Sequence, residues 1–222
     1  MTNLDYLKNL NSEQKKAVIT TDGPLLVVAG AGSGKTRVLT SKIVYLIKEK
    51  KIIPNQILSV TFTNKAASEM QNRVIKMLKS SSKGLPWLGT FHSICAKLLR
   101  KHARSVGLNS NFTIIDTDDQ VRLIKNICKS ENIDTKKLSP KVILSIIDRW
   151  KNKGYYPEKV IINKKDIYEK TILPIYKIYQ KKLVDLNACD FGDLILHCVE
   201  MLEKDTGIRE IYTNNFKYIL VD

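Results

Sequence analysis

The sequence has no uninterrupted apolar run of about eighteen residues or more, so no segment predicts a membrane-spanning helix. Its first residues show neither the basic start nor the apolar stretch of a secretory signal peptide, and we therefore expect a cytoplasmic protein without a membrane partner. The four cysteines are far apart and form no Cys-x-x-Cys pair, which gives little support for a metal site or for disulfides. In a reducing compartment they are expected to be small buried hydrophobic residues.

Acidic side chains are also in the minority. Lys and Arg number 37 against 22 Asp and Glu, which leaves a formal net charge of +15. Such a surplus favours a polyanionic partner, although a lysine-rich surface without a specific partner is an equally good explanation of charge alone. The 222 residues, 43% of them hydrophobic, are enough for a globular chain with one large domain or two small ones.

Three of the ten glycines lie within residues 29–36, which match the phosphate-loop pattern except that Ala29 replaces the first glycine. The apolar run 25–28 before this stretch predicts a strand, and the period of the apolar residues after it predicts a helix. The loop amides would then bind phosphates, Lys35 would reach the β and γ phosphates, and the Thr36 hydroxyl would bind Mg²⁺. Kinases, GTPases and motor proteins share such a loop, so it indicates nucleotide binding and not yet one reaction.

Two later strand patterns end in aromatic and polar residues. The run 57–61 leads into Phe62, Thr63 and Asn64, and a second short strand, within residues 87–93, is expected to end in Thr90, Phe91 and His92 before a helix. In an open α/β sheet, ligands bind at the carboxyl ends of the strands. Phe62 is therefore a candidate to stack on a base while the polar groups, Thr61 included, hold backbone phosphates. A core position for Phe62 and helix-capping roles for Thr63, Asn64 and His92 are the alternatives.

The character of the sequence changes at Thr117, where a capping-box pattern opens a series of amphipathic helices that continues to about residue 187. A second helix is predicted to begin at Ser139-Pro140, and a third to span residues 165–186 with a kink at Pro174. We interpret this region as a helical subdomain inserted into an α/β domain. Its positive charge comes from Lys151, Lys153, Lys164, Lys165, Lys170, Lys177, Lys181 and Lys182.

The α/β pattern returns after residue 187 and ends with the apolar strand 218–221 and Asp222. An apolar strand that ends in Asp is typical of a Walker B motif, whose carboxylate holds Mg²⁺ opposite the phosphate-loop Thr. The alternative is an ordinary edge strand that ends at a polar residue. We favour the Mg²⁺-binding interpretation because the phosphate loop lies upstream.

Together these blocks resemble the N-terminal half of the motor of the UvrD/Rep/PcrA family of superfamily 1 DNA helicases. In this family Ala29 is the typical first residue of the loop. The resemblance covers the whole chain in the order of the family's motifs, and the matching blocks are residues 10–18 (Q motif), 29–39 (motif I), 60–70 (motif Ia), 89–93, 190–194 and 221–222 (the start of motif II).

The resemblance implies a RecA-like phosphate-loop NTPase domain with a parallel sheet, plus an inserted all-helical subdomain. The expected parts are residues 1–115 and 188–222 for the RecA-like domain and residues 116–187 for the insert, which in the family contacts duplex DNA. The implied activity is that of an ATP-dependent DNA helicase that moves 3′→5′ with ATP and Mg²⁺. Its expected partners are single-stranded DNA and the junction between single- and double-stranded DNA.

The resemblance also assigns roles to residues. Lys35 and Asp222 are the expected catalytic residues, Gln14 would read the adenine, and Arg37 would lie along the base or ribose. Gly192 departs from the family, which commonly has an acidic residue at this position. The expected nucleotide-binding residues are Gln14, Ala31, Gly32, Ser33, Gly34, Lys35, Thr36 and Arg37, Mg²⁺ would be held by Thr36 and Asp222, and DNA would be bound by Thr61, Phe62, Thr63, Asn64, Thr90 and His92.

In the family, motif II continues beyond the position of Asp222 into a Glu that activates water, and a second RecA-like domain supplies arginines to the γ phosphate. We therefore expect this chain to be the N-terminal fragment of a longer helicase, with that second domain as its partner, and to hydrolyse ATP poorly by itself. Three alternatives stay open: the helicase part of a RecB- or AddA-type helicase-nuclease, a nucleotide- and DNA-binding module without turnover, and a small-molecule kinase.

Overall fold

The computed structural model describes residues 5–30, 32–79, 85–162 and 167–222 and divides the chain into two compact units. Unit 1 consists of Met1–Ile94 and Glu210–Asp222, and unit 2 of Cys95–Arg209. No helix among the described residues is long and apolar enough to cross a membrane. The helices are α1 (Ser12–Ile19), α2 (Lys35–Lys48), α3 (Asn64–Leu78), α4 (Phe91–His102), α5 (Thr117–Ser130), α6 (Pro140–Asn152), α7 (Ile167–Asp185), α8 (Phe191–Lys204) and α9 (Thr206–Asn215), joined by the short 3₁₀ turns η1 (Asp5–Leu7), η2 (Pro54–Gln56), η3 (Ala103–Val106) and η4 (Pro157–Lys159).

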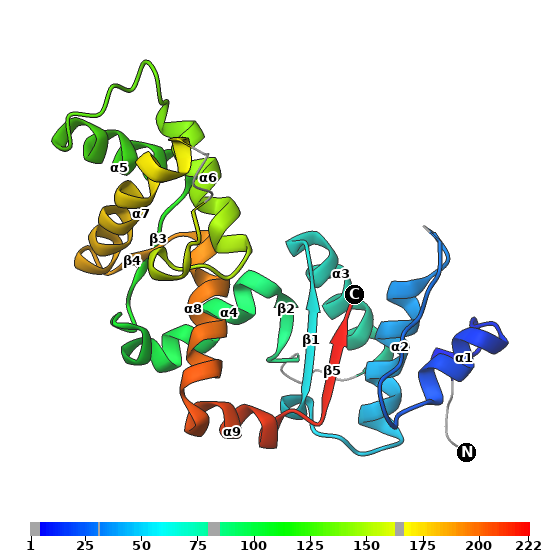
Figure 1. The fold of residues 1–222 in the computed structure, drawn as a ribbon. Helices are drawn as coiled ribbons and strands as arrows, with labels where there is room; N and C mark the ends of the chain where they lie inside the picture. Colours follow the sequence, from blue (N-terminus) through cyan, green and yellow to red (C-terminus); the bar gives the residue numbers. More distant parts are fainter. Residues whose placement is uncertain (1–4, 31, 80–84, 163–166) are drawn as a thin grey trace. The chain divides into compact units, whose positions relative to one another are not determined.

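Unit 1 is built on a parallel sheet with the strand order β2-β1-β5 (Figure 1). The central strand β1 (Ile57–Thr61) pairs with β2 (Leu88–Thr90) on one side and with β5 (Tyr218–Val221) on the other. Because all three strands run in the same direction, their carboxyl ends lie at one edge of the sheet. The predicted strands at 57–61 and 218–221 are confirmed. The short strand predicted to end in Thr90, Phe91 and His92 is present only as far as Thr90, and its predicted end is wrong because Phe91 and His92 already belong to α4.

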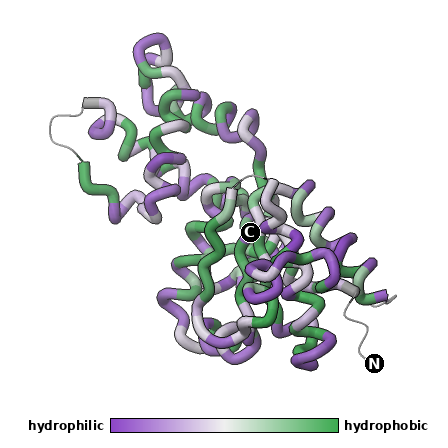
Figure 2. The backbone as a smooth tube through the Cα atoms, turned by 90° about the vertical axis from the view of Figure 1, so that its right-hand side faces the viewer, coloured by the Kyte–Doolittle hydropathy of each residue, from purple (hydrophilic) through white to green (hydrophobic). Residues whose placement is uncertain are grey.

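Helices α2 and α3 pack against each other and supply much of the core of unit 1. Along the coils of the backbone hydrophobic and hydrophilic residues alternate (Figure 2), a pattern that gives an amphipathic helix one apolar stripe. The buried members of the core cluster are Tyr6, Ile43, Val44, Leu46, Ile57, Val74 and Leu85.

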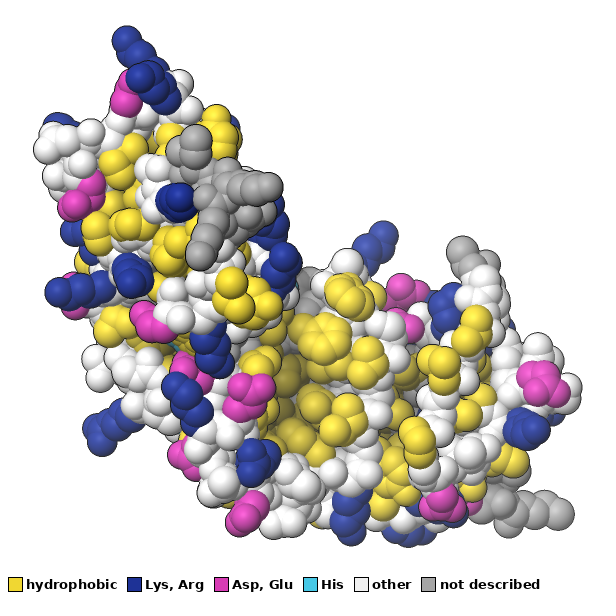
Figure 3. All heavy atoms as spheres, in the orientation of Figure 1, with side chains coloured by type: hydrophobic (Ala, Val, Ile, Leu, Met, Phe, Trp, Pro, Cys, Tyr) yellow, Lys and Arg dark blue, Asp and Glu magenta, His cyan; other side chains and the backbone are white. Residues whose placement is uncertain are grey.

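Residues 25–28 were predicted to form the strand that enters the phosphate loop, and this prediction is wrong for the structure, which has no strand there. A strand needs partners for its backbone N–H and C=O groups, and a cavity of about 630 Å³ lies between residues 23–27 and β5. Pro24, at the start of the run, also has no N–H to donate. The run is therefore exposed, with Leu26 at 86% and Val28 at 87%, and hydrophobic side chains gather over the strand region of unit 1 in Figure 3.

Helix starts follow the predicted capping chemistry with one exception. Ser139 caps α6 ahead of Pro140, as predicted, and at α1 the Asn11 side chain accepts a hydrogen bond from the Gln14 N–H. Helix α5, however, is capped by Asp116 and not by Thr117, since the Asp116 carboxylate accepts from the Asp119 N–H at 2.9 Å. A carboxylate is the better cap at this position because it also interacts favourably with the positive end of the helix dipole.

Unit 2 is mainly helical, and its core forms where the apolar faces of α5, α6 and α7 meet. Trp150 stacks on Tyr176 with ring centroids 5.8 Å apart, and both rings are buried. The aliphatic part of this core comprises Ile124, Ile127, Leu138, Ile143, Leu144, Ile147, Ile172, Ile175 and Leu183.

A short parallel pair of strands, β3 (Thr113–Ile114) and β4 (Ala188–Cys189), lies at the ends of the predicted insertion. Asn187 reinforces the pairing, because its side-chain oxygen accepts from the Asn109 N–H at 2.8 Å. The two ends of the segment 116–187 are thus close in space. The domain boundaries at 115/116 and 187/188 stay a prediction.

A buried cluster of charges ties α6 to α8 within unit 2. The Lys151 ammonium lies 2.6 Å from Asp190 and 2.7 Å from Asp193, and all three side chains are 0% exposed. Tyr179 of α7 donates to Asp190 at 2.9 Å, and Gln180 of α7 donates to Asp193 at 3.0 Å. Burial opposes the charge of Lys151, yet the two carboxylates outweigh burial and hold its pKa above the ordinary value. The ammonium likewise outweighs burial at Asp193 and keeps the pKa of that carboxyl low.

We expect acidification from pH 7 towards pH 5.5 to destabilise unit 2 through His197, which lies 2.5 Å from the Tyr156 hydroxyl. Burial lowers the pKa of His197, so on acidification the unfolded chain binds the proton before the folded protein does. The stability that the folded protein has with a neutral His197 is therefore complete above about pH 6.5, and it is lost as the pH falls below that value. The slope for this one site is at most about 1.4 kcal/mol per pH unit. Asp148 also titrates differently in the folded protein, because burial raises its pKa. Urea unfolding of wild type and His197→Gln at several pH values separates the effect of His197 from that of Asp148. Identical pH profiles for the two proteins would rule out this origin.

Candidate nucleotide and nucleic-acid site

The phosphate loop turns directly into α2 through glycines in the left-handed region. Gly34 is the N-cap of α2 with a φ of 88°, and Gly32 has a φ of 75°, a conformation that favours glycine. The Ser33 hydroxyl donates to the Gly30 carbonyl at 2.7 Å and closes the turn. Ala31, also predicted to bind the nucleotide, lies outside the described residues. The amides at the start of α2, with the positive end of its dipole, can bind an anion.

Lys35 and Thr36, the first two residues of α2, lie beside the phosphate loop, and their predicted roles stay predictions. The Lys35 ammonium folds back over the loop and donates to the Ala29 and Gly30 carbonyls, each at 2.8 Å. The Thr36 hydroxyl lies 3.4 Å and 3.3 Å from the two carboxylate oxygens of Asp222. Asp222 is carried there by β5, since its N–H donates to the Val60 carbonyl of β1 at 3.0 Å.

The oxygen ligands at this point suit Mg²⁺. Among the described residues there is no group of three or more His, Cys, Asp or Glu side chains that could hold a metal ion. Mg²⁺ does not require such a group, because it is usually bound through one or two carboxylates, waters and the phosphates of its substrate. The pair Thr36 and Asp222 therefore fits a metal that arrives with a nucleotide.

Gln14 is positioned against the phosphate loop by the helix cap of α1. Its side-chain oxygen accepts from the Asn11 N–H at 3.0 Å, and its side-chain nitrogen donates to the Ser33 carbonyl at 2.9 Å. A β-carbon at Gly34 would lie 3.2 Å from that nitrogen, so the close approach depends on glycine. A carboxamide has two N–H donors and two acceptor lone pairs. Gln14 thus keeps one N–H donor and one acceptor lone pair for hydrogen bonds to the edge of a base. Its contact with adenine stays a prediction.

Arg37 lies one turn into α2 and is exposed. It lines a cavity of about 710 Å³, whose wall also includes Tyr6, Asn9 and Thr40. The cavity offers an aromatic ring and polar side chains beside the guanidinium. This setting is compatible with the predicted contact to a base or ribose, which stays a prediction.

The predicted DNA-binding residues of the two strand ends lie side by side. The parallel register pairs Thr61 with Thr90 at the carboxyl ends of β1 and β2. Phe62 follows Thr61 and is 78% exposed, and Asn64 at the start of α3 is also exposed. This exposure argues against a core position for Phe62 and leaves its ring available to stack on a base.

The threonines of this group are occupied with structural roles. Thr61 and Thr90 are buried, and Thr63 caps α3 by accepting from the Ala66 N–H at 3.1 Å. The Thr90 hydroxyl accepts from the Ser93 N–H at 3.2 Å, at the start of α4. These two hydrogen bonds hold the two strand-to-helix turns. Direct contacts to DNA by the threonines, and by the half-buried His92, stay predictions.

Sequence reasoning missed Phe91 as a member of this site. Its ring lies 5.5 Å from that of Phe62, tilted by 56°. The signal was present, because Thr61-Phe62 and Thr90-Phe91 repeat the same dipeptide at the ends of two strands, and adjacent parallel strands bring equivalent positions together. The two rings form one aromatic surface at this edge of the sheet.

One of the lysines predicted to make the helical region positive has a different role. Lys151 is buried between Asp190 and Asp193 and offers no charge to a ligand, so its inclusion in the basic surface is wrong. Gly192 explains part of the arrangement, since a β-carbon there would lie 3.0 Å from the Lys151 Cδ atom. The missing side chain leaves room for the lysine. Lys164 and Lys165 lie outside the described residues.

Comparison with known proteins gives one family and a consistent set of relatives. The family described as "UvrD/REP helicase N-terminal domain" matches residues 10–222. Over 216 residues, or 97% of this chain, the sequence is 46% identical to the ATP-dependent DNA helicase PcrA of Staphylococcus epidermidis and 44% identical to the protein of that name from Staphylococcus aureus. The matched part is 30% of each relative, so the chain spans about a third of the length of these curated proteins.

Proposed function

Because the chain belongs to the UvrD/REP helicase N-terminal domain family, we propose that it is the ATP- and single-stranded-DNA-binding N-terminal part of a DNA helicase that moves 3′→5′. The observation that carries the proposal is the approach of the Thr36 hydroxyl to the Asp222 carboxylate at 3.3 Å and 3.4 Å, beside the loop that begins α2. A metal-binding hydroxyl opposite a carboxylate, next to anion-binding amides, is the arrangement that a Mg²⁺-nucleotide needs.

Bound Mg²⁺ would neutralise charge that develops on the transferred phosphoryl group. The side chains act around it. Thr36 and Asp222 would hold the ion, the amides at the start of α2 would bind the phosphates, and Lys35 would exchange its two carbonyl acceptors for phosphate oxygens. Asp222 faces the metal position and would therefore not also orient the attacking water. We propose accordingly that efficient turnover requires groups supplied by the remainder of the protein, including a second RecA-like domain.

DNA would be bound at the strand edge formed by β1 and β2. The rings of Phe62 and Phe91 offer stacking surfaces, while Asn64 and His92 offer polar groups beside them. The proposed substrates are a single strand and its junction with a duplex, the latter contacted by the helical segment 116–187. β1 ends at the proposed DNA edge and pairs with β5, which leads to Asp222, so this strand would connect the nucleotide to the grip on DNA.

The direct test is made on the whole protein. Its ATPase rate should rise when single-stranded DNA is added, and it should unwind a duplex with a 3′ single-stranded tail in preference to one with a 5′ tail. An ATPase indifferent to DNA would refute the helicase proposal. Unwinding that prefers the 5′ tail would refute the direction alone.

Thr36→Val is expected to weaken Mg²⁺-ATP binding by roughly tenfold while leaving Mg²⁺-free ATP binding unchanged, because the valine keeps the shape and removes one metal ligand. Calorimetric titration with ATP in excess Mg²⁺ and in chelator measures both. Thr20→Val is the matched control, since the Thr20 hydroxyl donates to the Lys16 carbonyl at 2.8 Å at the end of α1. The same Mg²⁺ dependence in wild type and Thr36→Val would remove the metal role of this residue.

A further inference from the structure

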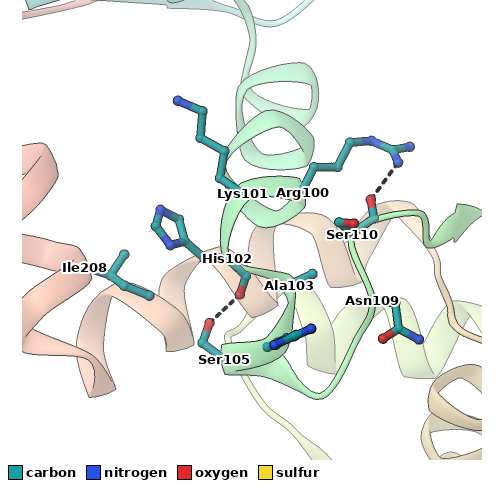
Figure 4. A pocket seen from close by; sticks show the side chains of 9 residues that line it. Arg100, Lys101, His102, Ala103, Ser105, Asn109, Ser110 and Ile208 are labelled. Atoms are coloured by element: carbon teal, nitrogen blue, oxygen red, sulfur yellow. Dashed lines mark hydrogen bonds between the residues drawn. The ribbon is translucent and has the colours of Figure 1, made fainter.

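We propose that a basic cavity at the end of α4 is a second DNA-backbone site, which binds phosphate groups in unit 2. The inference rests on the proposed function, because it takes DNA to be the polyanion. The cavity has a volume of about 380 Å³, many times the roughly 30 Å³ that a water molecule occupies. It is lined by Arg100, Lys101, His102, Ala103, Arg104, Ser105, Asn109, Ser110 and Ile208 (Figure 4).

The side chains that line the cavity include hydrogen-bond donors and no carboxylate that would repel an anion. Arg100, Lys101 and Arg104 are cationic, and none of the nine lining residues, all of them described, is acidic. The side-chain amide of Asn109 adds a neutral donor. Guanidinium groups bind phosphate through paired N–H donors, which makes arginine the most suitable residue for such a site.

Stabilisation of the helix end does not need all of this charge. Cations near a helix C-terminus interact with its unsatisfied carbonyl groups, but the last carbonyl of α4 and two carbonyls of η3 have other partners. The Ser105 hydroxyl donates to the His102 carbonyl at 2.7 Å, and the Gly107 and Leu108 N–H groups donate to the carbonyls of Arg104 and Ala103. These three carbonyls are satisfied without the cationic side chains, which can therefore also serve an anion.

Arg100 is held in place before any ligand arrives. Its guanidinium carbon lies 4.7 Å from the centre of the Phe112 ring, and one of its nitrogens donates to the Ser110 carbonyl at 3.2 Å. Figure 4 shows the Arg100 side chain extended towards Ser110, with Asn109 on the same side of the helix. A guanidinium carries five N–H donors, so one bond to Ser110 leaves donors for a phosphate. A positioned side chain loses less conformational entropy on binding.

The test measures DNA binding by the 222-residue chain as a function of salt. The probes are a fluorescent oligothymidine strand of about 16 nucleotides and a duplex of the same length, titrated by anisotropy. Arg104→Ala is expected to weaken binding roughly tenfold at low salt. It should also make the slope of log K against log salt less steep by about 0.7 if a single strand occupies the cavity, or about 0.9 if a duplex does. Arg100→Lys, which keeps the charge but loses the fork and the ring contact, should weaken binding as well.

The controls separate this inference from the proposed function. Lys50→Ala removes one exposed charge at the far end of α2 and should change neither affinity nor slope. Phe62→Ala tests the strand-edge site independently. If wild type binds, Phe62→Ala binds weakly and both arginine variants bind as wild type does, the cavity is not a DNA site and the proposed function stands. If wild type binds neither probe, both the inference and the proposed function fail.

Discussion

Lys35→Ala is expected to lower the DNA-stimulated ATPase turnover of the whole protein by about 10²–10³-fold, the loss typical of removing one preorganised charge from a developing oxyanion. The effect should fall mainly on kcat, because the lysine interacts most strongly with the charge of the transition state. Steady-state rates at saturating single-stranded DNA, over a range of Mg²⁺-ATP concentrations, separate kcat from KM.

The structure gives the reason for assigning this role to Lys35. Its ammonium donates to two carbonyls of the loop at 2.8 Å, which holds the charge over the turn that the phosphates would enter. Lys42 is the matched control, since it lies on the same helix and also donates to two backbone carbonyls, those of Ala17 and Thr20. Lys42→Ala should lower thermal stability and leave the turnover of the folded protein unchanged. A fall of less than about threefold in Lys35→Ala would contradict the proposed role.

The approach of Thr36 to Asp222 could be predicted from sequence because each of the two residues belongs to a local pattern. Glycine at positions 32 and 34 allows the left-handed backbone that leads into α2, and Asp222 directly follows the apolar strand β5. Thr36 and Asp222 are 186 positions apart, yet the parallel pairing of β5 with β1 brings them together. Their proximity could be predicted because Thr36 lies at the start of a helix and Asp222 directly follows a strand, and both ends can be recognised in the sequence.

The remaining features depend on contacts that a local pattern does not contain. The apolar residues 25–28 have the composition of a strand, but the neighbouring edge of β5 lies across a cavity and offers them no hydrogen bonds. Phe91 became part of the strand-edge site only through the register that pairs Thr61 with Thr90. Burial of Lys151 was also beyond prediction, because its partners Asp190 and Asp193 and the room left by Gly192 lie some forty positions away.

Lys151→Met is expected to reduce the free energy of unfolding of unit 2 by about 3–5 kcal/mol, the loss found when one partner of a buried ion pair is removed. The methionine fills similar space, so the main effect is electrostatic: Asp190 and Asp193 would remain buried without their cation. Trp150, which stacks on Tyr176 next to this cluster, reports the unfolding through its fluorescence in a Trp87→Phe background. Urea titrations provide the measurement.

The pH dependence distinguishes this electrostatic effect from a packing defect. In wild type the ammonium keeps the pKa of Asp193 low, whereas without it burial would raise that pKa above the unfolded value. The folded Lys151→Met protein would then bind more protons than the unfolded chain, so its stability deficit should shrink as the pH falls from 8 to 5. Lys153→Met, an exposed control at the end of α6, should change stability by less than about 0.5 kcal/mol at either pH. A deficit that stays constant with pH would mean that packing, and not the two carboxylates, makes Lys151 necessary.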